Sequence, residues 1–393
     1  MSSAEPAADR ADRADRADRA DRSDRAGHAA GTLLGGGHPI VGPLMGHHHE
    51  TYVLRLPGAD GRWKIREPRS GVLHADRRCF HSEEDVICGL AELPVGLPVP
   101  EVREVGGCRL QRFVEGRTLA ALTGADGRVP ERYVDQLMPV FGGLGSVRPG
   151  LLNVERSCDP ADRAEDGDTT YFLGRLVHFA EHRVYRAQHA TYGSLFAALG
   201  VPDDALRRYA ERLGTLAPRP FCLLHGDLHR ENLVVDRDDR LWVIDWELAM
   251  LGDPLYDLAT HLYLTRYPAD QERSVVERWC TEIERVLPGG SKGYEDDLPR
   301  LRAFKCVQSV CTDVIRTAMT LSERPEDPSG SARAAAKLVR VLRAARAPLE
   351  LPTVPDEVDA EAALRDWLSN LDSLGSRGSR GSLDSRGSLD SLA

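Results

Sequence analysis

The segment from Leu223 to His261 decides the fold; it reads LLHGDLHRENLVVDRDDRLWVIDWELAMLGDPLYDLATH. Two short apolar runs in it, LVVD and LWVID, flank an acidic turn and predict two neighbouring strands. Asp227 and Asn232 lie on the loop before the first strand, and Asp245 ends the second. The pattern therefore gathers two carboxylates and an amide around one strand-turn-strand unit.

These three side chains match the needs of phosphoryl transfer from a nucleotide. That reaction needs a carboxylate to orient or deprotonate the acceptor hydroxyl, and oxygen ligands for Mg²⁺. Asp227, Asn232 and Asp245 supply these groups in the order that a protein-kinase-type catalytic loop uses them. An ordinary acidic turn is the competing interpretation, and we expect the kinase-type site.

The segment resembles the aminoglycoside phosphotransferase family of small-molecule kinases, which share the protein-kinase-like fold. The resemblance rests on four stretches: HGDLH at 225–229 with Asn232, IDWE at 244–247, GDP at 252–254 and DLA at 257–259. It implies that Asp227 is the catalytic base and that Asn232 and Asp245 bind Mg²⁺. Protein kinases carry an arginine before the catalytic aspartate and a lysine two residues after it. This chain has Gly226 and His229 there, which indicates a small-molecule acceptor.

Three further polar residues of the motif are expected to be structural. His225 would hold the catalytic loop. Asp253 precedes Pro254 and fits a turn, and Asp257 can cap or brace the helix that follows. We expect stability, rather than chemistry, to explain these three positions.

Residues 41–115 predict an antiparallel sheet with one helix. TYVLRL and WKIR, on either side of the turn PGADGR, indicate a hairpin, and VREV and CRLQRFVEG are two more strand candidates. A helix pattern begins at Ser82, which can cap it. The resemblance implies that this sheet is the ATP-binding lobe.

Lys64 is the candidate for the lysine that grips the nucleotide phosphates. The chain has four lysines, and Lys64 is the only one before residue 292. The resemblance implies a helix glutamate as its partner. Glu83 shares a helix face with Val86, Ile87 and Leu90, so we expect Glu83 to point inward and Glu84 to stay solvated.

The nucleotide should also meet two backbone segments. Gly46 and the amides of the following histidines, 47–49, are candidates for phosphate contacts, although a polar loop ahead of a strand is the favoured interpretation. The resemblance places adenine against the backbone of Arg112, Phe113 and Val114. Glu115 is expected to form only a surface ion pair.

The sequence thus predicts an α+β, bilobal, protein-kinase-like fold, with a small antiparallel-sheet N-lobe carrying one helix and a large, mainly helical C-lobe. We expect the N-lobe at 41–115 and the C-lobe at 116–372. Helical periodicity runs through 171–199, 203–216, 268–287, 298–321, 332–346 and the stretch from Leu364 to Leu371. Residues 1–40, with their ADR triplets, and the Gly/Ser-rich residues 373–393 are expected to be disordered tails.

The charge balance argues against a nucleic-acid partner. The chain has 51 Lys and Arg against 61 Asp and Glu, a formal charge of −10. From Pro220 to Arg300 there are 17 acidic and 9 basic residues, a surplus that would attract a cationic acceptor. Candidate acceptor-side carboxylates are Glu247, Asp270, Glu295, Asp296 and Asp297.

Cysteine usage and hydropathy predict a cytoplasmic protein without a membrane partner. The eight cysteines include no CxxC pair, which fits reduced thiols. No apolar run approaches the ~20 residues that span a bilayer, and the N-terminus has no apolar signal core.

Two patterns resemble a metal site and a redox pair, but neither is expected to have that role. His178 to His182 spells HxxEH, the spacing of some zinc peptidases, but no third ligand is identifiable. A solvated helix face is the favoured interpretation, with an acceptor contact as the alternative. Cys306 and Cys311 are expected to be small core residues of a helix.

We therefore expect a kinase that uses ATP and Mg²⁺, with GTP left open, to phosphorylate a hydroxyl of a small molecule, plausibly an aminoglycoside or another antibiotic. A metabolite kinase of the choline, homoserine or sugar type is the alternative. A nucleotide-binding regulatory protein without turnover is the third hypothesis. The chain is expected to be a monomer or a dimer.

Overall fold

The computed structural model describes residues 41–45, 49–56, 58–68, 77–124, 126–323 and 330–381. The expected tail at 1–40 and Gly46 lie outside these residues. The chain divides into two compact units, one of Met1–Thr169 with Pro218–Tyr294 and the other of Thr170–Ala217 with Glu295–Ala393. This division does not separate residues 41–115 from the catalytic segment, so the lobe boundary at residue 115 stays a prediction.

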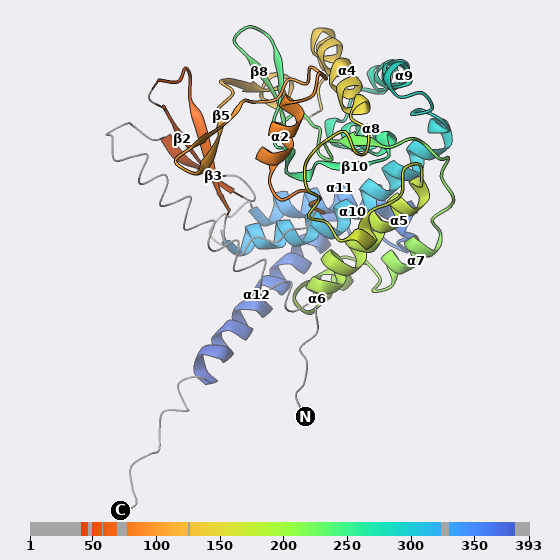
Figure 1. Cartoon of the computed structure of the whole chain (residues 1–393). Helices are drawn as coiled ribbons and strands as arrows, with labels where there is room; N and C mark the ends of the chain where they lie inside the picture. The colour runs from red at the N-terminus through yellow and green to blue at the C-terminus, as the bar shows by residue number, and fades with distance from the viewer. Residues whose placement is uncertain are drawn as a thin grey trace, which may run out of the picture. The chain divides into compact units, whose positions relative to one another are not determined.

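The first unit contains a five-stranded antiparallel sheet in the order β1-β2-β3-β5-β4 (Figure 1). The predicted hairpin is confirmed: β2 pairs with β3, and Val53 lies opposite Lys64. On its other side β3 pairs with β5, where Lys64 lies opposite Gln111. The strands are β1 (Val41–Met45), β2 (His49–Leu54), β3 (Trp63–Pro68), β4 (Val102–Val105) and β5 (Cys108–Arg112).

One face of β3 is apolar and the other is charged. Trp63 and Ile65 are buried in a cluster with Leu54, Leu56 and Leu110. Because successive side chains of a strand point to opposite faces, Lys64 and Arg66 share the other face. The strand thus presents two cations side by side, away from its hydrophobic cluster.

The predicted helix is α2 (Glu83–Ala91), and Ser82 caps it. The Ser82 hydroxyl accepts a hydrogen bond from the Asp85 N–H at 3.1 Å. The buried residues of α2 include Glu83, Val86, Ile87 and Leu90, as the helical spacing predicted. The helix contacts β4 and the short 3₁₀ helix η4 (Trp246–Leu248), which follows Asp245.

The remainder of the first unit holds the motif segment. The two predicted strands are β8 (Leu233–Asp236) and β9 (Leu241–Val243), which pair with each other, and β8 also pairs with β6 (Gly116–Thr118). β7 (Cys222–Leu224) pairs with β10 (Met250–Gly252). The helices are α3 (Leu119–Thr123), α4 (Glu131–Ser146), α8 (Pro254–Thr265) and α9 (Ala269–Val286).

The second unit is helical where it is described. The periodic run 171–199 is not one helix, because a π-helical segment, η2 (Ala180–Tyr185), and the 3₁₀ turn η3 (Arg186–Gln188) separate α5 (Thr169–Phe179) from α6 (His189–Ala198). The other helices are α7 (Ala205–Glu211), α10 (Tyr294–Glu323), α11 (Gly330–Leu349) and α12 (Glu357–Gly381). Residues 373–381, expected in the tail, lie in α12. No helix within the described ranges is both long and apolar enough to span a membrane.

Candidate active site

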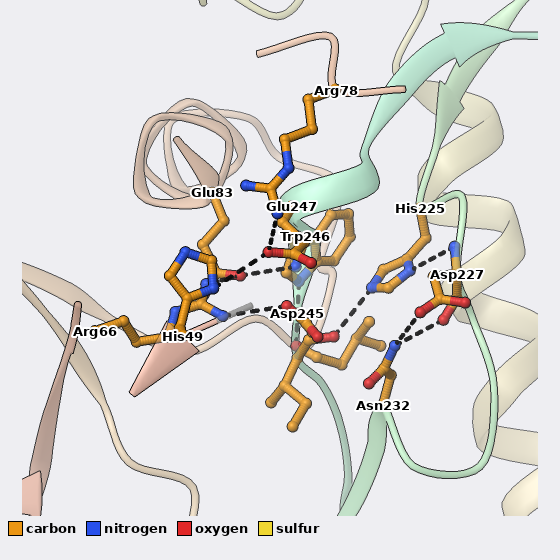
Figure 2. A network of polar contacts seen from close by, with 12 residues as sticks. His49, Arg66, Arg78, Glu83, His225, Asp227, Asn232, Asp245, Trp246 and Glu247 are labelled. Carbon is orange, nitrogen blue, oxygen red and sulfur yellow. Dashed lines mark hydrogen bonds and ion pairs between the residues drawn. The ribbon is translucent and has the colours of Figure 1, made fainter. Parts of the chain in front are cut away.

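Asp227 and Asn232 are joined directly on the loop between β7 and β8 (Figure 2). The Asn232 Nδ2 group donates to the Asp227 carbonyl at 2.8 Å and to the Asp227 carboxylate at 3.1 Å. Because a carbonyl oxygen can only accept, these contacts fix which end of the amide faces Asp227. The Oδ1 atom of Asn232 is left as an acceptor or ligand for something else.

Asp257 of α8 holds the start of this loop. Its carboxylate accepts hydrogen bonds from the His225 N–H at 2.9 Å and the Gly226 N–H at 2.8 Å. Gly226 has a φ of +79°, and a Cβ there would lie 2.4 Å from the Leu248 carbonyl oxygen. Only glycine fits this backbone, which explains the second position of the HGD motif.

The buried His225 ring connects the loop to the end of β9. Its Nδ1 accepts from the Asp227 N–H at 3.3 Å, so Nε2 carries the proton and donates to the Ile244 carbonyl at 3.1 Å. The ring also packs edge-on against Trp246. His225 therefore positions Asp227 and Asp245 relative to each other through their own backbone, in line with its expected structural role.

His229 lies beside the Asp227 carboxylate, a contact that was not predicted from the sequence. Its Nδ1 accepts from the Glu231 N–H at 3.3 Å, and its Nε2 lies 3.4 Å from the Asp227 carboxylate. Burial lowers the pKa of His229, but the hydrogen bond to Asp227 and the charges of Asp227, Glu231 and Asp245 raise it above its ordinary value. At the position where a protein kinase has its lysine, His229 therefore favours its charged form more than a free histidine does.

Asp245 is held in a left-handed conformation by the residues around it. Its φ is +66° and ψ is +65°, a region that non-glycine residues seldom adopt. Arg66 Nη1 donates to its carboxylate at 3.1 Å. Burial raises the pKa of Asp245, but the positive charges of Arg66 and Lys64 bring it below its usual value. The carboxylate is thus kept ionised, as a metal ligand must be.

Glu83 pairs with Arg66. The Arg66 guanidinium contacts the Glu83 carboxylate, which also accepts from the Trp246 N–H at 3.0 Å. Glu83 therefore faces inward, as its helix position predicted, and joins α2, β3 and the Asp245 turn. Arg66 is not among the residues predicted for the site, although the sequence holds a signal for it: it lies two residues after Lys64 and so on the same face of β3.

Lys64 lies near this pair without joining it. Among the described residues, it forms no ion pair within 4 Å. Burial and the charge of Arg66 lower its pKa, whereas Glu83, Asp245 and Glu84 raise it less strongly. The Gln111 amide opposite Lys64 and one oxygen of Glu83 are buried without a hydrogen-bond partner. Buried polar atoms are normally paired, so these atoms indicate a place for a polar ligand.

Glu247 belongs to the same polar network. It accepts from Arg78 at 2.9 Å and lies 3.4 Å from His49 Nδ1 (Figure 2). Burial and the neighbouring Asp245 carboxylate raise the pKa of Glu247 to about 7. The three residues come from the segment before α2, from β2 and from η4, so the network joins segments far apart in the sequence.

The expected adenine segment follows β5. The Arg112 N–H donates to the Glu101 carbonyl at 2.7 Å, and the Phe113 N–H donates to the Arg62 carbonyl at 2.8 Å. Both amides therefore already donate hydrogen bonds to backbone carbonyls next to the sheet. The exposed Glu115 pairs with Arg62 at 2.9 Å, as expected for a surface ion pair.

Two of the acceptor-side candidates have structural partners. Asp270 forms an exposed ion pair with Arg128. Asp297 is buried, accepts from the Ala217 N–H at 2.9 Å and lies 3.6 Å from Arg300. Asp253 also has a structural role, because it caps α8 and forms a fully buried two-contact pair with Arg219 at 2.8 and 2.6 Å.

The HxxEH pattern spans the end of α5 and the start of the π-helical segment η2. Glu181 is buried and pairs with Arg186 at 2.8 Å, and the rings of His178 and His182 lie 4.2 Å apart. No cluster of three or more potential metal-ligating residues occurs in the part of the chain that the structure describes. Glu181 thus has an ion-pair partner on the next turn of its own segment.

A model of the phosphotransferase enzyme family matches residues 41–304, and the chain belongs to this family. The resemblance to aminoglycoside phosphotransferases is thereby confirmed, as is the α+β, protein-kinase-like fold class.

Hygromycin-B 4-O-kinase of Escherichia coli is 26% identical over 213 residues, which cover 53% of this chain and 57% of that protein. The match thus spans less than two thirds of that relative. Choline kinase LicA of Streptococcus pneumoniae is similar with a TM-score of 0.47 and 14% identity, over 81% of this chain and 98% of that one. Macrolide 2'-phosphotransferase MphH of Brachybacterium faecium has a TM-score of 0.44 and 18% identity, over 78% and 93%.

Proposed function

We propose that this protein transfers the γ-phosphoryl group of ATP to a hydroxyl of a small molecule, in the cytoplasm. The observation that carries the proposal is the joined pair of Asp227 and Asn232, held by His225 and Asp257 at the end of the strand pair that presents Asp245. GTP is the alternative phosphoryl donor, because we propose no side chain that would distinguish adenine from guanine.

The residues present fit Mg²⁺ and a nucleotide. Asn232 Oδ1 and the ionised Asp245 carboxylate form an all-oxygen donor set, which Mg²⁺ prefers. The unpartnered Gln111 amide and Glu83 oxygen lie on the side of Lys64, where a polar ligand would satisfy them. When bound, Mg²⁺ neutralises charge on the phosphates during transfer.

In this mechanism Asp227 accepts a hydrogen bond from the acceptor hydroxyl and takes its proton as the oxygen attacks. Asn232 and His229 contact the Asp227 carboxylate and hold it in the position where it meets the acceptor hydroxyl. His229 in its charged form also offsets negative charge next to the transferred group. Asn232 and Asp245 are the proposed metal ligands.

Lys64 and Arg66 are the proposed phosphate-binding cations. Their shared face on β3 puts two positive charges next to Asp245, and Glu83 orients Arg66 through its ion pair. The adenine is proposed to lie against the backbone of Arg112, Phe113 and Val114. Because the first two amides are occupied, the Val114 N–H is the donor that we assign to the base. We also propose that residues 41–115 form the N-lobe. The contact of Gly46 with a nucleotide phosphate stays a prediction.

For the acceptor, we propose a hydroxylated antibiotic. The family match and the relative hygromycin-B 4-O-kinase support a hydroxyl acceptor of that kind. A metabolite such as choline is the second candidate, and the small-molecule kinase chemistry would be the same.

The test is phosphate transfer from ³²P-labelled ATP to a panel of aminoglycosides, macrolides, choline, homoserine and sugars, with and without Mg²⁺. We expect a labelled product from at least one hydroxylated compound, and a rate at least about 10²-fold lower with Asp227→Asn. Tight nucleotide binding without any labelled product would instead support the regulatory-protein hypothesis.

A further inference from the structure

Cys79 and Cys158, far apart in the sequence, are neighbours in the first unit. Phe80 pairs with Arg156 in an isolated antiparallel bridge, and the Ser157 N–H donates to the Cys79 carbonyl at 3.0 Å. This pairing places the two cysteines on adjacent backbone segments, where each thiol shifts the pKa of the other: that of Cys79 is raised and that of Cys158 is lowered. Both cysteines are free and buried.

A buried arginine lies against this thiol pair. Arg77 is only 5% exposed, and its Nε donates to the Cys79 sulfur at 3.3 Å. Within the described part of the chain, no carboxylate forms an ion pair with Arg77. Because a buried cation is costly unless a negative charge compensates it, the thiol pair is the natural source of that charge.

The surroundings favour a thiolate on Cys158. The adjacent Cys79 thiol lowers the pKa of Cys158, burial opposes this, and the charges of Arg156 and Arg77 lower it further. Arg163 fixes the same residue by donating to its carbonyl at 2.8 and 3.2 Å. By contrast, burial raises the thiol pKa at Cys88, Cys108, Cys222, Cys306 and Cys311.

We propose that Cys79 and Cys158 are a redox-active dithiol that closes to a disulfide by exchange with a small-molecule disulfide such as oxidised glutathione. The Cys158 thiolate attacks one glutathione sulfur, forms a mixed disulfide and expels the first glutathione thiolate. The Cys79 thiol then loses its proton and attacks the Cys158 sulfur, which expels the second. The two cysteines are oxidised by two electrons, and one glutathione disulfide is reduced to two thiols.

The roles of the two cysteines follow from their exposure. Cys158 is 7% exposed, whereas Cys79 is 0% exposed, so the incoming disulfide reaches Cys158 first. A nucleophilic thiolate next to a second thiol is the arrangement that redox-sensitive proteins use. The pair is also next to the site, because Arg78 bonds Glu247 and Glu83 follows four residues after Cys79.

The test uses the full-length reduced protein incubated with oxidised glutathione, quenched in acid, alkylated and digested for peptide mass spectrometry. We expect a peptide pair cross-linked through Cys79 and Cys158, which dithiothreitol reverses. Cys79→Ala should accumulate a glutathione adduct on Cys158, since no second thiol displaces it. Cys158→Ala should lose both products, and the control Cys306→Ala should behave as the parent does.

The outcome that overturns the proposal is glutathione addition confined to other cysteines, with no cross-linked pair recovered from the parent. This experiment on the parent needs no substitution, so a variant that fails to fold does not affect it. Disulfide mapping is also independent of phosphate transfer, and its result therefore stands apart from the proposed kinase activity.

Discussion

Nη1 of Arg66 lies 3.1 Å from Oδ1 of Asp245, so the carboxylate proposed to bind Mg²⁺ already has a cationic partner on β3. The same guanidinium pairs with Glu83 at the start of α2. Arg66 therefore connects a strand, a helix and the turn after β9 (Figure 2). The lysine that stands out in the sequence, Lys64, lies beside this connection and is not part of it.

Replacing Arg66 should cost more stability than replacing Lys64. Arg66→Gln leaves the buried Glu83 carboxylate without its cation, and the loss of one partner of a buried pair costs about 3 kcal/mol. Lys64→Gln removes no ion pair formed with a described residue, so its cost should stay below about 1 kcal/mol. Urea unfolding of both variants measures the difference. Equal losses in the two variants would show that Arg66 is not the structural partner of Glu83.

Asp227→Asn should lower kcat by about 10²- to 10⁴-fold, the range that a positioned general base contributes. The Asn232 hydrogen bond to the Asp227 carbonyl remains, so the loop should keep its shape and nucleotide binding should change little. Asp203→Asn, which alters an exposed carboxylate of the second unit, is the matched control. Steady-state kinetics and nucleotide titration separate the two effects. A variant that keeps its kcat would remove Asp227 from the catalytic role.

Asn232→Ala should raise the Mg²⁺ concentration needed for half-maximal activity. The substitution removes the amide oxygen proposed as a ligand, and loss of one ligand weakens the site without abolishing it. Excess Mg²⁺ should therefore restore part of the rate. The Mg²⁺ dependence of Asp227→Asn should match the parent in its midpoint. If the Asn232→Ala midpoint is unchanged, the asparagine orients Asp227 and does not bind the metal.

Two groups with shifted pKa values, Glu247 and the buried His261, should give opposite pH dependences of stability. The pKa of Glu247 is raised from 4.5 to about 7, so its protonated form stabilises the fold below pH 4.5 and this contribution is lost as the pH rises through 7. The pKa of His261, buried between the Leu228 carbonyl and the Tyr267 hydroxyl, is lowered from 6.5 to about 4. Its contribution is present above pH 6.5 and is lost as the pH falls through 4.

Each contribution is on the order of 3 kcal/mol. One falls and the other rises with pH, so their pH dependences nearly cancel between pH 4.5 and 6.5 in the parent. Glu247→Gln should show a stability that rises with pH in this range, and His261→Gln one that falls. Urea unfolding at pH 4.5, 5.5 and 6.5 without Mg²⁺ measures both slopes. Parallel curves for the two variants would contradict the assignment.

Substitution by alanine should have opposite effects on stability at two glycines. Gly226→Ala places a Cβ 2.4 Å from the Leu248 carbonyl at a φ of +79°, and should cost more than about 2 kcal/mol and most of the activity. Gly174 lies in α5 with open space around it, so Gly174→Ala should add about 0.5 to 1 kcal/mol of stability. Thermal unfolding with a rate assay tests both. A tolerated Gly226→Ala would mean that the loop can rearrange.

The sequence predicted the motif segment well because its signals are local. The strands at 233–236 and 241–243, the Ser82 cap and the inward face of Glu83 all follow from neighbours within a few residues. The partner of Glu83 could not be found in this way. Lys64 and Arg66 share a face of β3, and only the position of α2 in space decides which of the two meets the glutamate.

The helices of the second unit also show a feature that local sequence patterns do not predict. The run at 171–199 has regular apolar spacing, yet the chain inserts a π-helical segment where Glu181 is buried against Arg186. The π-helical segment is only 6 residues long, so the 3.6-residue spacing of the helices on either side does not reveal it. Division into compact units is likewise a property of long-range contacts, and a boundary drawn from composition does not anticipate it.

One carboxylate, that of Glu83, contacts both the cation of β3 and the backbone of the turn that carries Asp245. Under the proposed function, a phosphate that draws Arg66 toward it also acts on the residue that binds the metal. The affinities for nucleotide and for Mg²⁺ are then thermodynamically linked, and each ligand changes the binding constant of the other by the same factor. A side chain that touches neither ligand would set the size of that factor.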